Sequence, residues 1–142
     1  MFAPARAEIL RRLHTLAPDT RAVWGTMDAP RALCHLTDQL RVAVGAAGVN
    51  RQDTFMRRTV LKWVVVHGPF QAPPGKVQTT PEMLVSCPVD WNEDMAECIR
   101  LIEEVAKGEA NGIHPVFGPL TGTEWAKLGW RHLDHHLRQF GA

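Results

Sequence analysis

The sequence predicts an all-α protein in which four main helices and one short helix pack as a bundle with a long crossover connection. Three observations support this prediction. Apolar residues recur at helical spacing in four segments, residues suited to helix N-caps precede three of them, and the run Val64-Val65-Val66 has no second convincing strand to pair with. With 142 residues, of which 45% are hydrophobic, the chain fits one domain over residues 1–142 that can bury a core.

The first helix is expected over residues 4–17, where Pro18 stops it, and the second from about Thr26 or Asp28, with Pro30 tolerated in its first turn. Residues 45–48, which begin and end with glycine, terminate the second helix. The expected buried faces are Ile9, Leu10, Leu13 and Leu16 in the first helix, and Leu33, Leu36, Leu40 and Val44 in the second.

Residues 57–67 are apolar and are expected to form the short helix. Residues 68–88 contain five of the ten prolines and two glycines, which predicts a long irregular connection. A third helix is expected to begin at Asp90 and to reach Lys107, and residues 112–119 should form a tight loop. The buried face of this third helix is expected to be Met95, Cys98, Ile99, Ile102 and Val105.

Thr121 and Glu124 form the pattern of a capping box, which predicts that a last helix begins there and runs to Gln139. Gly141 lies two residues beyond its expected end.

The charge balance argues against nucleic acid and against an anionic membrane as partners, because 16 basic and 15 acidic residues give a net charge of only +1. The sequence contains no apolar run long enough to span a bilayer, and we expect no signal peptide. Cys34, Cys87 and Cys98 lack the spacing of metal ligands. They suit a reducing compartment, so a cytoplasmic location is expected.

Histidines on two helices suggest a metal site. His132 and His136 are four residues apart, so they lie one turn apart on one face of the last helix and can point at a common ion. His35, beside the apolar stripe of the second helix, can supply a third nitrogen. Three imidazoles leave a coordination position open, as in catalytic zinc sites. Because ligation needs neutral imidazoles, affinity is expected to fall as the pH drops through about 6.5.

Alternatives remain for several of these residues. An H-x-x-x-H pair also occurs by chance, and histidines near a helix C-terminus complement the helix dipole. His135 is an alternative ligand at i+3 from His132, and His114 either lies over the site or stabilises its own loop. Cys34 adjoins His35, but neighbours on a helix point about 100° apart, which argues against a Cys–His nucleophile pair. Candidate acceptors for imidazole N–H groups are Asp38, Gln39 and Asp134.

An ordered set of short motifs resembles one branch of the DinB/YfiT-like superfamily of metalloenzymes, a branch catalogued as a domain of unknown function. The similarity spans nearly the whole chain. The motifs are Trp24-Gly25-Thr26-Met27, Leu33-Cys34-His35-Leu36-x-Asp38, His114-Pro115-x-Phe117-Gly118-x-Leu120, Glu124-Trp125 and His132-x-x-His135-His136-Leu137-x-Gln139-Phe140-Gly141.

The resemblance implies an up-and-down four-helix bundle with its long crossover between the second and third helices. It also implies a metal triad of one histidine on the second helix and two on the last, which map onto His35, His132 and His136. Some members of the superfamily use low-molecular-weight thiols such as bacillithiol, mycothiol or glutathione, and many form homodimers. A thiol cofactor and a homodimer are therefore expectations for this chain.

Two classes of function follow. The first is a metal-dependent enzyme that acts on a small molecule, either a thiol-dependent transferase or a hydrolase that uses the metal to activate water, with zinc or nickel as the expected ion. The second is a non-catalytic metal-binding or dimerising helical module. An accessible coordination position inside a pocket would favour the enzyme, whereas burial of all three histidines without a cavity would favour the module.

Overall fold

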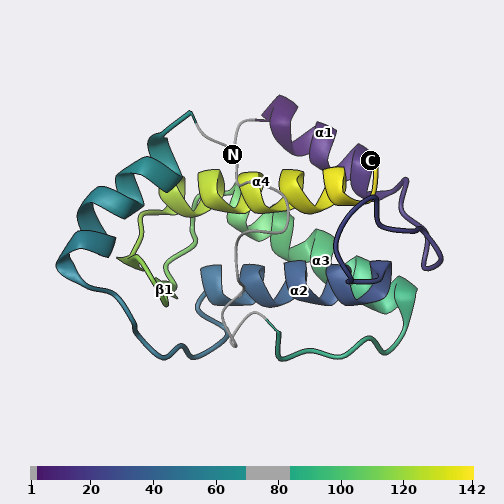
Figure 1. The fold of residues 1–142 in the computed structure, drawn as a ribbon, viewed down its shortest axis with the longest axis horizontal. Helices are drawn as coiled ribbons and strands as arrows, with labels where there is room; N and C mark the ends of the chain where they lie inside the picture. Colours follow the sequence, from purple (N-terminus) through teal and green to yellow (C-terminus); the bar gives the residue numbers. More distant parts are fainter. Residues whose placement is uncertain (1–2, 70–83) are drawn as a thin grey trace.

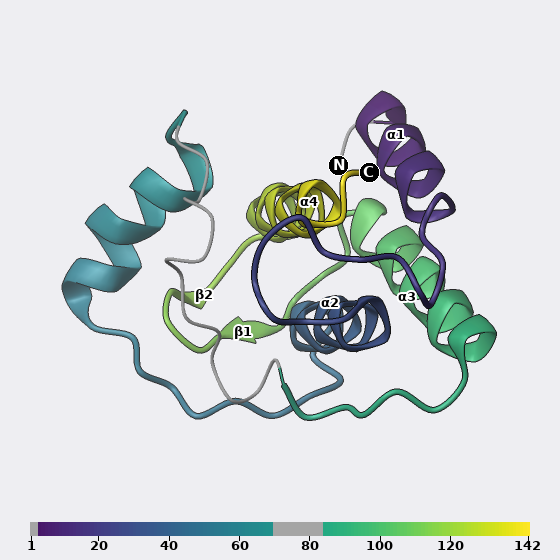
Figure 2. The same cartoon turned by 45° about the vertical axis from the view of Figure 1, so that its right-hand side comes forward.

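The computed structural model describes residues 3–69 and 84–142, and helices account for most of them (Figures 1 and 2). The predicted helical class is therefore confirmed. α2 (Ala29–Ala43) and α4 (Gly122–Gln139) run side by side in opposite directions, as Figure 1 shows. α3 (Trp91–Ala106) packs against both, and α1 (Ala3–Leu13) packs against α4. None of the helices in these described ranges is both long enough and apolar enough to cross a membrane.

α1 ends at Leu13 rather than at residue 17. The amides of Thr15 and Leu16 bond to carbonyls three residues back, those of Arg12 (3.0 Å) and Leu13 (3.1 Å), which tightens the chain out of the α-helix. The Thr15 hydroxyl also donates to the Arg12 carbonyl (2.6 Å), so a side chain competes for this acceptor. Leu16 is buried all the same, as its position in the apolar pattern predicts.

α2 begins where the sequence predicts. The Asp28 carboxylate accepts from the backbone N–H of Arg31 (2.8 Å), and Pro30 lies in the first turn. Between Ala29 and Ala43 this helix buries almost every side chain, including polar ones, because α3 covers one face and α4 another. A helix enclosed in this way can hold polar groups out of water, which is a condition for the site described below.

The segment expected to be a short helix is helical, but its backbone has wider, π-type turns in two pieces, η1 (Arg57–Leu61) and η2 (Trp63–His67). We call residues 55–67 the arm. Figure 2 shows the arm standing to one side of α2, α3 and α4. Arg131 of α4 anchors it by donating to the carbonyls of Val65 (2.7 Å) and Gly68.

Much of the arm's apolar surface faces outward. Phe55 is 80% exposed, Met56 61%, Val60 55% and Trp63 64%, whereas Val66 is buried. Exposed apolar surface on this scale marks a candidate contact with another molecule. Of the irregular connection expected over residues 68–88, residues 70–83 lie outside the described ranges.

α3 and α4 both start at the predicted caps. The Asp90 carboxylate accepts from the amides of Asn92 and Glu93 (both 3.0 Å), and Thr121 and Glu124 form both bonds of the capping box. The expected tight loop at residues 112–119 is a small antiparallel hairpin of β1 (Ile113–His114) and β2 (Gly118–Pro119). These starts fix the angular position of every later side chain on each helix.

One hydrophobic cluster connects α1, α2, α3, α4 and the hairpin. Its largest fully buried side chain is that of Trp125, whose ring N–H donates to the Gly112 carbonyl (2.9 Å). A nearly buried ion pair between Arg12 and Asp134 (2.8 Å) ties α1 to α4. The α3 face includes Leu101, which the predicted stripe omits, while Met95 and Ile99 are only partly buried. Fully buried apolar members of the cluster include Ile9, Leu13, Leu33, Leu36, Leu40, Ile102, Leu133 and Leu137.

Candidate metal centre

Three histidines from two helices meet between α2 and α4. We call His35, His132 and His136 the histidine triad. Their ring centroids lie 4.6 to 4.8 Å apart, and one nitrogen from each ring lies within 4.8 Å of the other two. Nε2 of His35 and Nε2 of His132 lie 2.8 Å apart. His35 is buried and the other two are partly buried, so the three rings share a space that is largely closed to water.

This arrangement fits a tetrahedral ion with small adjustments. Zinc–nitrogen bonds of about 2.0–2.1 Å at tetrahedral angles hold ligand nitrogens about 3.3 Å apart. The His35–His132 pair is somewhat closer than that, and all three nitrogens lie within 4.8 Å of one another, so rotations of the rings would bring them to one ion. The donor set is three imidazoles, which suits zinc, copper, iron or nickel rather than calcium or magnesium. The triad can therefore hold a metal ion.

Burial favours the neutral form of two rings of the triad, those of His132 and His136. Burial, supported by the neighbouring histidines, lowers the pKa of His136 to about 4 and that of His132 well below its usual value. A neutral imidazole has a lone pair free for a metal, whereas an imidazolium has none. At pH 7 these two rings are therefore in the form that can coordinate an ion.

Gln139 sets the orientation of His136. The Gln139 amide nitrogen donates to the Trp24 carbonyl (3.0 Å), so its Oε1 is the atom that faces Nδ1 of His136 (2.7 Å). Because this oxygen can only accept, Nδ1 of His136 carries the proton and Nε2 keeps its lone pair. A hydrogen bond of this type is how proteins fix the tautomer and ring orientation of metal-binding histidines. Gln139 is buried, which shields the contact from solvent.

The loop before α2 leaves room for this amide. Gly25 has a positive φ of 79°, and a Cβ added there would lie 2.7 Å from Nε2 of Gln139. The Val23 amide donates to the Gln139 carbonyl (2.7 Å), so the loop contacts both the backbone and the side chain of Gln139. The candidate acceptors predicted from the sequence do not include Gln139. Its position at i+3 from His136 is the signal that identifies it.

The remaining histidines lie outside the triad. The His135 ring contacts Trp24 and His136 edge to face, with centroids 6.1 and 5.1 Å apart, and it is not among the converging nitrogens. His114 stacks on Phe117, and its Nδ1 accepts from the amides of Val116 and Phe117 (both 3.1 Å), so it stabilises its own hairpin. Burial lowers the pKa of His114 to about 4. The other two lie elsewhere. Nδ1 of His14 lies 2.7 Å from the Leu10 carbonyl oxygen, and His67, at the end of the arm, contacts the Glu124 carboxylate of α4 (3.5 Å).

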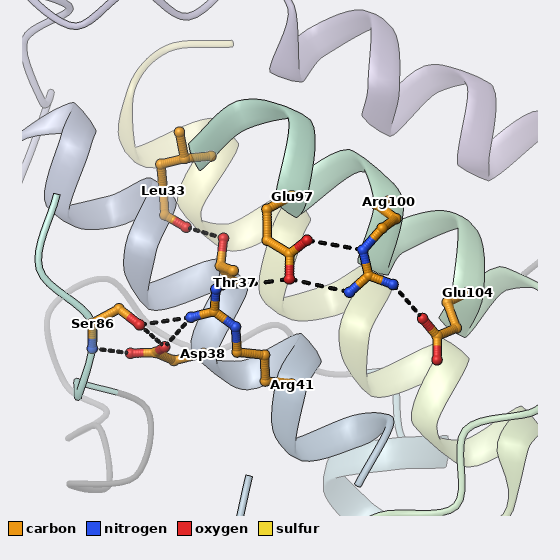
Figure 3. A network of polar contacts seen from close by, with 8 residues as sticks. All are labelled: Leu33, Thr37, Asp38, Arg41, Ser86, Glu97, Arg100 and Glu104. Carbon is orange, nitrogen blue, oxygen red and sulfur yellow. Dashed lines mark hydrogen bonds and ion pairs between the residues drawn. The ribbon is translucent and has the colours of Figure 1, made fainter. Parts of the chain in front are cut away.

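Two of the three acceptors expected from the sequence serve the fold instead. Figure 3 shows the Asp38 carboxylate bonded to Ser86 and Arg41, which attaches the segment before α3 to α2. Asp134 pairs with Arg12 (2.8 Å) and Arg138 (3.0 Å). The third, Gln39, is 2% exposed and its amide has no hydrogen-bond partner among the residues that the structure describes.

The two buried cysteines, Cys34 and Cys98, are not activated as nucleophiles. Burial raises the pKa of Cys34 to about 11 and that of Cys98 to about 12, so both stay as thiols at neutral pH. Cys87 is exposed, and all three are free of disulfides.

Two hollows lie away from the triad. One of about 480 Å³ lies between residues 45–51 and residues 111–113. The other, of about 270 Å³, lies between the arm and the hairpin, against Phe117 and Pro119. Neither is lined by a histidine, so a ligand of the triad would not occupy these hollows.

Comparison with known proteins identifies the family of this chain. Residues 3–142 match a family described as "Protein of unknown function (DUF1569)", and this range includes the whole histidine triad. Neither a curated protein nor a solved structure matches the chain. The expected placement in a group of unknown function is therefore confirmed. The chain belongs to this family of proteins of unknown function.

Proposed function

We propose that this protein binds one divalent metal ion through His35, His132 and His136. We also propose that α1 to α4 form the up-and-down four-helix bundle of the DinB/YfiT-like superfamily, as a single domain. The observation that carries the metal proposal is the convergence of three imidazole nitrogens from α2 and α4, two of them on rings that burial keeps neutral. Zinc or nickel is the preferred ion because imidazole donors suit both.

The donor set supports an enzyme. Three neutral ligands leave the charge of a divalent ion uncompensated and a coordination position open. An ion held in this way acts as a Lewis acid and lowers the pKa of a bound thiol or water. The protein's own residues would hold the ion, fix the His136 tautomer through Gln139 and limit the access of water. We therefore propose a metal-dependent transferase, with a low-molecular-weight thiol as cofactor, or a hydrolase that acts on a small molecule.

Two observations favour the alternative, a non-catalytic metal-binding or dimerising module. The two hollows described above lie away from the triad, and the arm exposes apolar side chains. For either function we propose a cytoplasmic location, which the three free cysteines support.

Alanine variants test the ligand assignment. His35→Ala, His132→Ala and His136→Ala should each lower metal affinity by more than the roughly 10–100-fold expected for a residue that only orients a ligand. Calorimetric titration of the metal-free, tag-free protein with zinc and with nickel measures this loss. His135→Ala changes the same helical turn but spares the triad, so it should bind like the parent. Equal binding by all four variants would rule out the site.

The pH dependence of metal binding should reflect burial. Because the folded protein holds the pKa of His136 near 4, protons should compete with the metal only below about pH 5, not from the ordinary value of 6.5. Folding behaves differently. In the unfolded chain His132 and His136 take up protons at a higher pH than in the folded protein. Their effect on the free energy of unfolding is therefore absent above about pH 6.5, and the protein loses stability as the pH drops from there toward 4. Zinc titrations between pH 7.5 and 5, with circular dichroism to verify folding, should show nearly constant affinity. A steady loss from pH 7 downward would contradict this.

Gln139→Met tests the outer contact. The variant keeps the length of the side chain but removes the acceptor for Nδ1 of His136, so metal affinity should fall about 10–100-fold. Arg138→Met is the matched control, because Arg138 pairs with Asp134 and does not touch the triad. A Gln139→Met protein that bound metal as tightly as the Arg138→Met protein would show that the contact does not orient a ligand.

The arm provides the test of the proposed homodimer. If its exposed apolar side chains pack against a second copy, the parent should scatter light as two chains and Trp63→Glu as one. Val89→Glu is the control for the added negative charge, because Val89 is also apolar and exposed (84%) but lies before α3, outside the arm. A parent that stays monomeric at high concentration would refute the dimer without affecting the metal proposal.

A further inference from the structure

Gln39 is a buried residue whose hydrogen-bonding capacity the fold does not use. Gln39 is 2% exposed, and its side-chain atoms Nε2 and Oε1 are both buried without a hydrogen-bond partner among the described residues. The amide loses its hydrogen bonds to water when the protein folds and gains none in return, which is unfavourable. Buried polar side chains nearly always have partners, so this exception indicates that a partner from outside the chain completes it.

The helical register places Gln39 beside the triad. Residues four apart lie on one face of a helix, so Gln39 follows His35 by about one turn, about 6 Å along α2. Ala43 lies one turn further, and its carbonyl accepts from the Gly112 amide (2.9 Å), directly before β1. Gln39 is therefore positioned between the triad and the hairpin.

The hairpin adds a second polar group on the same side. The His114 ring lies against Trp125, with centroids 5.5 Å apart. Trp125 precedes His132 by seven residues, which places both on one face of α4. Because Nδ1 of His114 accepts two amide N–H groups, its proton is on Nε2. The region that contains Gln39 thus holds polar groups of α2 and of the hairpin.

We propose that Gln39 binds a small molecule that coordinates the metal through one atom and presents a peptide-like amide group. This proposal rests on the metal site proposed above. A glutamine amide offers one acceptor and a donor group in a plane, so its best partner is another group with an acceptor and a donor, such as a carboxamide or a peptide bond. The separation of one helical turn requires the metal-binding atom and the amide to be a few bonds apart.

Two thiols test this proposal. N-acetylcysteamine carries an amide two carbons from its thiol, and 1-butanethiol carries none. The cobalt-loaded protein, titrated with each, reports thiolate binding through its sulfur-to-cobalt absorption. The parent should bind N-acetylcysteamine about tenfold more tightly than butanethiol, as one additional hydrogen bond allows. Gln39→Leu should bind both thiols with equal affinity.

Thermal unfolding of the metal-free protein separates this role from a structural one. Gln39→Leu replaces an unpaired amide by an apolar group of similar size, so its midpoint should equal or exceed that of the parent. Gln139→Leu is the matched control: both of its amide atoms are bonded, so this variant should lose several degrees.

The outcomes are distinct. A parent that takes up no cobalt would refute the metal site itself. A cobalt-loaded parent that binds the two thiols equally, or binds neither, would overturn only the role of Gln39. If the Gln39→Leu variant unfolded at a lower temperature and still preferred the thiol with the amide, Gln39 would bind a buried water molecule that stabilises the fold. This result would likewise overturn the proposal.

Discussion

Packing α2 against α4 brings three imidazoles into a space that largely excludes water, and many of the surrounding contacts follow from that constraint. His35 on one helix meets His132 and His136 on the other. Desolvation then favours the neutral forms of His132 and His136, since a charge is costly there. Different hydrogen bonds hold the two ends of the interface between α2 and α4. Gln139 joins α4 to the loop before α2, and the Gly112 amide joins the hairpin to the end of α2.

Much of the helical framework is predictable from local signals. Asp28, Asp90 and Thr121 are short polar side chains that bond to the next free amides, so each sets a helix start within about one residue. The spacing of His132 and His136 then fixes their common face. The meeting of that pair with His35 follows from the apolar stripe of α2, because His35 lies between Leu33 and Leu36. The sequence therefore identifies all three residues that the structure brings together.

Other features depend on contacts that no short window contains. α1 ends early because the Thr15 hydroxyl and two amides compete for its last carbonyls. The π-type turns of the arm do not follow from the apolar pattern of residues 57–67. Asp38 is bonded to Ser86, far along the chain, so its role in the fold appears only once α2 and the segment before α3 are adjacent (Figure 3). Gln139 likewise acquires its function from Trp24, a residue of a distant loop.

α4 has contacts on several sides along its length. Glu124 pairs with Lys62 of the arm, Trp125 bonds to Gly112, His132 and His136 face α2, and Gln139 bonds to Trp24. Successive side chains on a helix point about 100° apart around its axis. Deleting or inserting one residue within α4 would rotate every later contact away from its partner. Natural length variation in this family should therefore be confined to loops such as residues 45–54, while α4 keeps a constant number of residues.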